Sequence, residues 1–198
     1  MSEFVIHPWE KKDEFKDLRM FPFEITQAHL YPFVPRAHDV DQDLHRGLAA
    51  IASVVSQNTS VHNAATKLLR TTEWDFMAVY YDMIDHFCHS FMKYHPPRLP
   101  AVDKENYDIF KEAVTGSYIF QDMMLDRKLK LIDKDTTVIV MSDHGFESGE
   151  KRILDMPKVQ AAPSLEHRQF GMFVAAGPNI KENTKVFGLG LIDVAPTI

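Results

Sequence analysis

The chain is built around a short apolar run that ends in a carboxylate, an imidazole and a glycine. This segment is Val138-Ile139-Val140-Met141-Ser142-Asp143-His144-Gly145-Phe146. Consecutive β-branched and apolar residues are typical of a strand that is covered on both faces. Asp143 and His144 follow at the strand end, and Gly145 allows the backbone to turn. Because open α/β sheets bind ligands at the carboxyl ends of their strands, Asp143 and His144 are candidate ligands of a divalent metal such as Zn²⁺. An Asp-His pair also occurs in caps and turns, so the hypothesis needs partners elsewhere in the chain.

Length and composition favour an ordinary globular protein. The 198 residues fit one domain, and a hydrophobic content of 45% is ample for a core. The net charge is −6 and no basic stripe is visible, which argues against binding of duplex nucleic acid. The single cysteine, Cys88, excludes an internal disulfide. No apolar run reaches the roughly 18 residues that span a membrane. The first eight residues lack the charged and then apolar segments of a secretory signal. The compartment stays open.

Helical and strand patterns alternate along the chain. Residues 1–36 are rich in proline and aromatic residues. We expect them to form an irregular surface excursion whose aromatic side chains pack onto the rest of the domain, while residues 37–198 form an α/β core. One helix is predicted from Asp39 or Asp41 to Arg70, with residues 58–60 as a candidate interruption. A second, long helix is predicted over 102–131, and strands over 75–81, 136–141 and 169–175. This alternation predicts a mostly parallel, helix-covered sheet.

Asp85 and His89 lie four residues apart, just after the predicted strand 75–81. If this segment is helical, both side chains fall on one face and can bind one ion, whereas Cys88 points elsewhere. The alternative is the start of an amphipathic helix that carries polar residues by chance.

His167 follows a polar loop and precedes an apolar strand, a position that is more typical of a loop histidine than of a ligand. In a parallel strand it would lie at the wrong edge of the sheet. Either the strand near 169–175 is antiparallel, or the preceding loop folds over the site; we predict the antiparallel strand. His167 should then lie within roughly 15 Å of Asp143, because ligands of neighbouring metals are close together.

Together these segments resemble the alkaline phosphatase superfamily, in particular its type I phosphodiesterase/nucleotide pyrophosphatase branch. The resemblance covers roughly residues 75–198 with clear motifs and the earlier residues more loosely. The matching segments are Tyr80-Tyr81 with Asp85 and His89, residues 140–146, Glu166-His167-Arg168, residues 171–178 and residues 193–197.

The resemblance implies a two-metal hydrolase of phosphodiester or pyrophosphate bonds, acting on a small phosphate ester or a nucleotide-like substrate. By position, Asp85, His89 and His167 would hold one ion, and Asp143 and His144 the other. The resemblance also implies zinc as the usual metal, with manganese as an alternative, and a Thr or Ser nucleophile bound to a metal. It gives no oligomeric state and no substrate identity.

The sequence departs from this family at its start. The family has an early strand that ends in a metal-binding Asp, followed by the nucleophile, and neither pattern occurs before residue 74. None of the hydroxyl residues of this region is assigned as the nucleophile: Thr59, Ser60, Thr66, Thr71 and Thr72. We expect the chain to be the later part of an alkaline-phosphatase-like catalytic domain that is inactive or weakly active by itself.

Two alternatives stay open. The first is another esterase of the same superfamily, a sulfatase or a phosphoglycerate mutase. A sulfatase needs a Cys or Ser in a Cys/Ser-x-Pro/Ala-x-Arg setting, and Cys88 is followed by His89-Ser90-Phe91-Met92. The second is a catalytically incomplete domain with a structural or interaction role.

Overall fold

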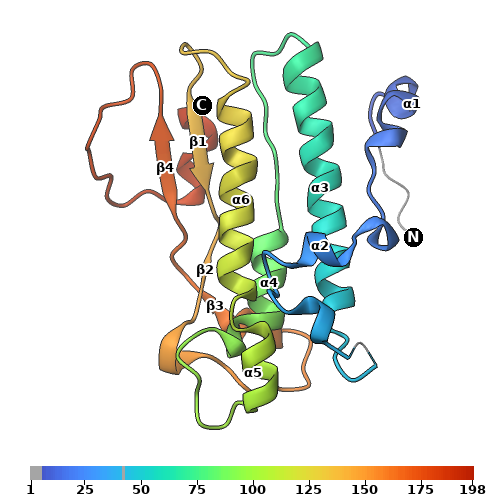
Figure 1. The fold of residues 1–198 in the computed structure, drawn as a ribbon. Coiled ribbons are helices and arrows are strands. Elements are labelled where there is room, and N and C mark those ends of the chain that lie inside the picture. Colours follow the sequence, from blue (N-terminus) through green and yellow to red (C-terminus); the bar gives the residue numbers. More distant parts are fainter. Residues whose placement is uncertain (1–5, 42) are drawn as a thin grey trace. The chain divides into compact units, whose positions relative to one another are not determined.

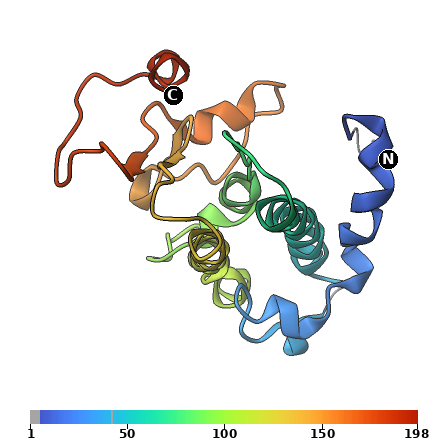
Figure 2. The same cartoon turned by 90° about the horizontal axis from the view of Figure 1, so that it is seen from above.

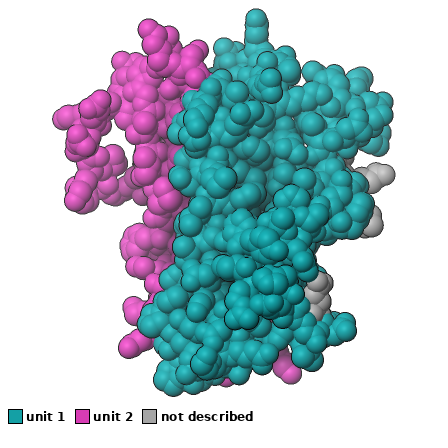
Figure 3. Space-filling model, viewed as in Figure 1, with its two compact units in different colours: residues 1–131 teal, residues 132–198 magenta. Residues whose placement is uncertain are grey.

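The α-helices all lie in the first two thirds of the described chain, and the strands lie in the last third. The structure is a computed structural model that describes residues 6–41 and 43–198. Most of the segment examined for a secretory signal, residues 1–5, lies outside the described residues. The chain forms two compact units, unit 1 with residues 1–131 and unit 2 with residues 132–198, which Figure 3 colours teal and magenta. Among the described residues, no helix combines the length and the apolarity that crossing a membrane requires.

Unit 1 is built around helices α3, α4 and α6. Helix α4 packs against both α3 and α6, and the view along the helices in Figure 2 shows these three side by side. The helices of unit 1 are α1 (Lys12–Phe15), α2 (Gln27–Leu30), α3 (Gly47–Thr71), α4 (Met83–Phe91), α5 (Lys104–Phe110) and α6 (Ala113–Leu129) (Figure 1). Short 3₁₀ turns connect several of them.

Aromatic side chains form the centre of unit 1. The ring of Phe33 is fully buried and lies 5.0 Å from Phe87 and 5.5 Å from Phe120, between ring centroids. Phe87 in turn contacts Phe91, which contacts Phe110. The expectation that the early aromatic residues pack is confirmed for Phe33. Leu30, Val34 and Ala37 are also buried, so one side of residues 30–37 belongs to the core, while Tyr31 on the same segment is 42% exposed. Phe23, in contrast, is 83% exposed.

Helix α3 differs from its prediction at its start. It begins at Gly47, because Asp41 instead caps an earlier turn: its Oδ1 accepts hydrogen bonds from the amides of Asp43 and Leu44. The helix runs without a break through residues 58–60, where two polar side chains are bonded inside the helix bundle and the buried Asn58 Oδ1 atom has no hydrogen-bond partner. The Ser60 hydroxyl donates to the Ser56 carbonyl, and the Asn58 amide donates to the Met124 sulfur.

The single helix predicted over 102–131 is wrong, because it divides into α5 and α6 at residues 111–112. Two separate contacts hold the two pieces. Phe110 at the end of α5 packs against Phe91 and Tyr94, with ring centroids 5.2 and 5.6 Å apart. Gly116 in α6 lies against the backbone of Pro32, where a Cβ atom would come within 2.2 Å of the carbonyl oxygen. Helical periodicity extends through both pieces and does not reveal the break between them.

The strand predicted over 75–81 is also wrong, since no strand is assigned to this segment. A strand is stabilised by backbone hydrogen bonds to a neighbouring strand, and the described residues of unit 1 contain no strand with which this segment could pair. An apolar and aromatic sequence therefore does not suffice to form a strand. The segment connects α3 to α4 as extended chain (Figure 1).

Unit 2 contains two antiparallel pairs of strands. Strand β1 (Val138–Met141) pairs with β4 (Phe173–Ala176), and Val140 lies opposite Val174. Strand β2 (Gly145–Phe146) pairs with β3 (His167–Arg168). The prediction of an antiparallel strand near 169–175 is confirmed. The mostly parallel sheet is not found in the described residues, so the fold is a helix-rich α/β arrangement with small antiparallel sheets. Strand β1 is partly buried and Met141 is exposed, which corrects the expectation of a strand covered on both faces.

Candidate metal centre

Two glycines let the backbone segments after β1 and before β4 approach each other closely. A Cβ atom on Gly171 would lie 2.3 Å from the Ser142 carbonyl oxygen, and one on Gly145 would lie 2.7 Å from the Phe170 carbonyl oxygen. Ser142 joins the two segments, because its amide donates to the Met172 carbonyl and its hydroxyl accepts from the Met172 amide at 2.9 Å. Gly145 is thus needed for close approach, and the turn that follows β1 is fixed from both sides.

The pairing of β2 with β3 places His167 beside His144. The two imidazole rings stack with centroids 3.7 Å apart and planes 11° apart. A ring nitrogen of each lies within 4.8 Å of one of the other. The Phe146 ring lies 5.5 Å from His144 and 5.0 Å from His167 and covers one side of the pair. His167 therefore lies beside the turn that holds Asp143, as the antiparallel strand predicts.

Asp143 and His144 offer one oxygen and one nitrogen at the same turn. The Asp143 Oδ1 accepts a hydrogen bond from the His144 amide at 3.1 Å and lies 3.7 Å from His144 Nε2. The other ring nitrogen, Nδ1, lies 3.1 Å from the Gly145 carbonyl oxygen. Because only a protonated Nδ1 can donate to a carbonyl, this contact assigns a proton to Nδ1, so that Nε2 is the nitrogen through which the neutral ring can bind a metal. The Asp143 side chain is 66% exposed, so its carboxylate is accessible.

Asp85 and His89 lie one turn apart on α4 in unit 1. The prediction that this segment is helical and presents both side chains on one face is confirmed, since His89 Nε2 lies 3.5 Å from Asp85 Oδ1. Cys88 points to the other side and is fully buried in the core. The hydrophobic residues Met83, Phe87 and Phe91 anchor the opposite face of the helix. The helix core thus fixes the direction of the Asp85-His89 pair.

Each Asp-His pair has the separation that a metal ion requires. Tetrahedral zinc binds His nitrogen and carboxylate oxygen at roughly 2.0–2.2 Å, which places two such ligand atoms roughly 3.3–3.5 Å apart. The distances of 3.5 Å in Asp85-His89 and 3.7 Å in Asp143-His144 are close to this value. The donor set of imidazole nitrogen and carboxylate oxygen also suits zinc and manganese.

The sequence hypothesis divided His144 and His167 between two different ions. Within unit 2 the structure brings these two rings into direct contact, a proximity that only the strand pairing could reveal. The assignment of Asp85, His89 and His167 to one ion and of Asp143 and His144 to the other stays a prediction.

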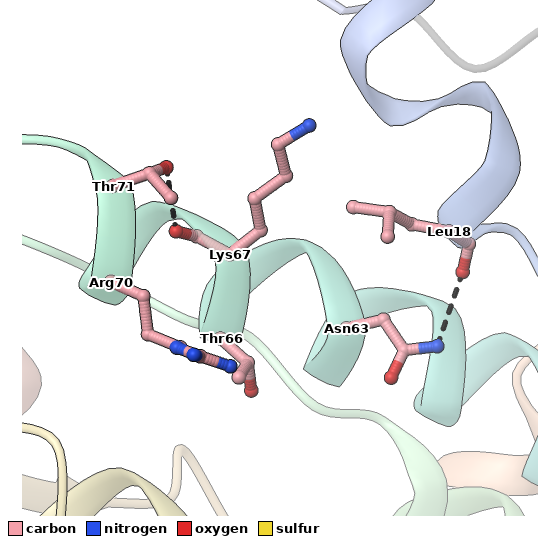
Figure 4. A pocket seen from close by; sticks show the side chains of 6 residues that line it. All are labelled: Leu18, Asn63, Thr66, Lys67, Arg70 and Thr71. Carbon is pink, nitrogen blue, oxygen red and sulfur yellow. Dashed lines mark hydrogen bonds between the residues drawn. The ribbon is translucent and has the colours of Figure 1, made fainter.

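Three of the hydroxyl residues of α3, Ser60, Thr66 and Thr71, have structural partners. The Thr71 hydroxyl donates to the Lys67 carbonyl, and Ser60 is buried and bonded to Met20. A pocket with a volume of about 380 Å³ lies along α3, and its lining residues are drawn in Figure 4: Leu18, Asn63, Thr66, Lys67, Arg70 and Thr71. These lining residues include no carboxylate and no imidazole, so the pocket lacks the donors of a metal centre. The nucleophile stays unassigned.

Comparison with known proteins identifies the family. The sequence model of the type I phosphodiesterase / nucleotide pyrophosphatase family matches residues 6–186. The chain belongs to this family of hydrolases, which is part of the alkaline phosphatase superfamily. No curated protein and no solved structure gives a significant match to the chain.

Proposed function

We propose that the chain is a metal-dependent hydrolase domain that acts on phosphate esters, at phosphodiester or pyrophosphate bonds. The observation that supports this most strongly is the family match, which spans residues 6–186 and includes all five candidate ligands. The geometry within each unit agrees with the proposal, because every aspartate of the set lies beside a histidine. The substrate class is a small phosphate ester or a nucleotide, and the fold is an alkaline-phosphatase-like domain.

The ligand sets follow from the order of the motifs. Asp85, His89 and His167 hold one divalent ion, and Asp143 and His144 hold the second, with zinc preferred to manganese. A pair of such ions stabilises the negative charge that develops on the attacking, leaving and non-bridging oxygens of a phosphoryl group.

The residues of the chain orient the donors of this site. The Gly145 carbonyl accepts from His144 Nδ1 and so fixes the tautomer and the ring orientation, which is the usual role of a group behind a histidine ligand. Phe146 lies against both imidazole rings and limits the access of water to them. The accessible Asp143 carboxylate faces solvent, from which a charged substrate would arrive.

Hydrolysis of a chromogenic diester tests the proposal. The purified chain is stripped with a chelator, reloaded with Zn²⁺ or Mn²⁺, and assayed by release of 4-nitrophenolate from bis(4-nitrophenyl) phosphate. Because the chain is expected to be weakly active by itself, we expect a slow rate that requires the metal and that falls to the rate of the metal in buffer in His144→Ala, since one ligand of a reactive ion is lost. His86→Ala is the matched control, because His86 is half-exposed on α4 and its ion-pair partner among the described residues is Asp82, at 3.3 Å.

A chain that binds the metal but hydrolyses the diester no faster than the metal in buffer would contradict the activity. That result would favour a domain of the family with a structural or interaction role. A metal-dependent rate that is equal in wild type and His144→Ala would contradict the ligand assignment.

A further inference from the structure

A cluster of three polar side chains in unit 1 lies outside the proposed metal centre. Lys128 is near the end of α6, His62 is on α3, and Tyr81 is in the segment between α3 and α4. The Lys128 Nζ atom lies 2.9 Å from His62 Nδ1 and also donates a hydrogen bond to the Tyr81 hydroxyl. The same ammonium lies 4.6 Å from the centroid of the Tyr81 ring. The amine is thus held in place by residues from two other parts of unit 1.

The partners of Lys128 are uncharged, which is unusual for a partly buried lysine. No carboxylate of the described residues pairs with it, whereas Lys130, two residues further on, pairs with Asp126 at 2.6 Å. The charged group that acts on His62 besides Lys128 is Arg127, another cation. Burial and the lack of an opposite charge both favour the neutral amine.

The electrostatics of the cluster agree with this geometry. Burial lowers the pKa of Lys128 to about 8. Burial, followed by the charges of Lys128 and Arg127, lowers the pKa of His62 to about 4, so its ring is a neutral hydrogen-bond acceptor at pH 7. Burial raises the pKa of Tyr81, which keeps its hydroxyl protonated.

We propose that Lys128 is a nucleophilic lysine that forms a reversible imine with small aldehydes. Its fixed Nζ atom lies between a neutral imidazole and a phenol, and its side chain is only partly buried, so that a small molecule can reach it. This site is separate from the proposed phosphoesterase activity, which uses none of these residues.

The reaction balances without an additional reagent. The lone pair of the neutral amine forms the C–N bond, and the carbonyl oxygen takes up a proton to give a carbinolamine. Loss of water then gives the C=N bond, with one oxygen from the aldehyde and two hydrogens from the nitrogen leaving as water. The Tyr81 hydroxyl can supply a proton to the departing oxygen and recover one from the nitrogen, since it contacts Nζ.

Reductive alkylation measures the reactivity of each lysine in the intact chain. The chain is treated with limiting acetaldehyde and cyanoborohydride at pH 7.5, which reduces and so traps the imine, and peptides are quantified by mass spectrometry. Lys130 is the internal control, on the same helix end but exposed and paired with Asp126. At pH 7.5 a lysine of pKa about 8 has about 200-fold more free amine than an ordinary lysine of pKa about 10.4. We expect Lys128 to be modified at least ~10-fold faster than Lys130, with a rate that reaches half its maximum near pH 8.

Equal or slower modification of Lys128 than of Lys130 would overturn the proposal. Tyr81→Phe tests the role of the phenol: it should slow the modification of Lys128 while that of Lys130 is unchanged. An unchanged rate at Lys128 in a variant with wild-type circular dichroism would overturn that role. Lys128→Arg should lose the fast-reacting site and leave the other lysines as before, and a fast phase that persists would place the reactive amine elsewhere.

Discussion

Replacement of Phe33 by alanine tests whether this early aromatic residue belongs to the core of unit 1. The ring is fully buried, and its centroid lies 5.0 Å from Phe87 and 5.5 Å from Phe120. Loss of a buried phenylalanine side chain costs about 3–5 kcal/mol, from lost transfer free energy and from the cavity. The neighbouring Pro32 backbone is held against Gly116, so we expect little collapse of the cavity and a loss of about 4 kcal/mol.

Urea unfolding followed by circular dichroism at 222 nm measures this loss. The α-helices of the described chain lie in unit 1, so the helical signal reports mainly on that unit. With a denaturant slope of about 2 kcal/mol per molar urea, the midpoint should fall by about 2 M. Phe23→Ala is the control from the same early segment: Phe23 is 83% exposed and stacks on Phe21, so its loss should cost less than ~1 kcal/mol. A loss for Phe33→Ala below ~1 kcal/mol, or one equal to that of Phe23→Ala, would refute the assignment of Phe33 to the core.

Three further predictions concern packing, pH and metal. Gly171→Ala should destabilise unit 2 by about 1–3 kcal/mol and speed amide hydrogen exchange at Met172, because the new methyl group meets the Ser142 carbonyl. In the control Gly190→Ala, the new methyl group meets a flexible Asp193 side chain, so the exchange at Met172 should be unchanged. The pKa of His62 is lowered in the folded state, so the unfolded chain binds more protons than the folded chain between about pH 6.5 and 4. The free energy of unfolding should therefore fall by about 1 kcal/mol, after solvent screening, as the pH falls through this window, and an equal fall in His62→Gln would contradict this. Zn²⁺ at 100 times its Kd should raise the free energy of unfolding by about 2.7 kcal/mol in a thermal or urea melt, and a chelator should reverse the gain; a melt that does not respond to either would count against the metal centre.

Local patterns predicted several elements correctly. The apolar run 138–141 forms β1, and the position of His167 relative to the Asp143-His144 turn led to the antiparallel strand that the structure contains. The i, i+4 spacing of Asp85 and His89 predicted their common face on α4. In each case the decisive information lies within a few residues of the chain, where the geometry of a helix or strand fixes it.

Features that depend on distant contacts were not predictable in this way. The break between α5 and α6 depends on how Phe110 and Gly116 pack against other segments, and periodicity does not record those contacts. The segment 75–81 has the composition of a strand but lacks a partner strand in the described part of unit 1. The stacking of His144 on His167 and the contact of His62 with Lys128 likewise join residues far apart in the chain.

Zinc binding by the intact chain tests the proposed metal centre most directly. The chain and its Asp85→Ala, Asp143→Ala and His86→Ala variants would be stripped of metal, titrated with Zn²⁺ at neutral pH, and measured by calorimetry and by elemental analysis after dialysis. We predict that the wild-type chain and His86→Ala bind zinc equally, and that Asp85→Ala and Asp143→Ala each bind at least ~10-fold more weakly, since each lacks a carboxylate ligand. A wild-type chain that retains neither zinc nor manganese, or an Asp85→Ala variant with wild-type affinity and stoichiometry, would contradict the account.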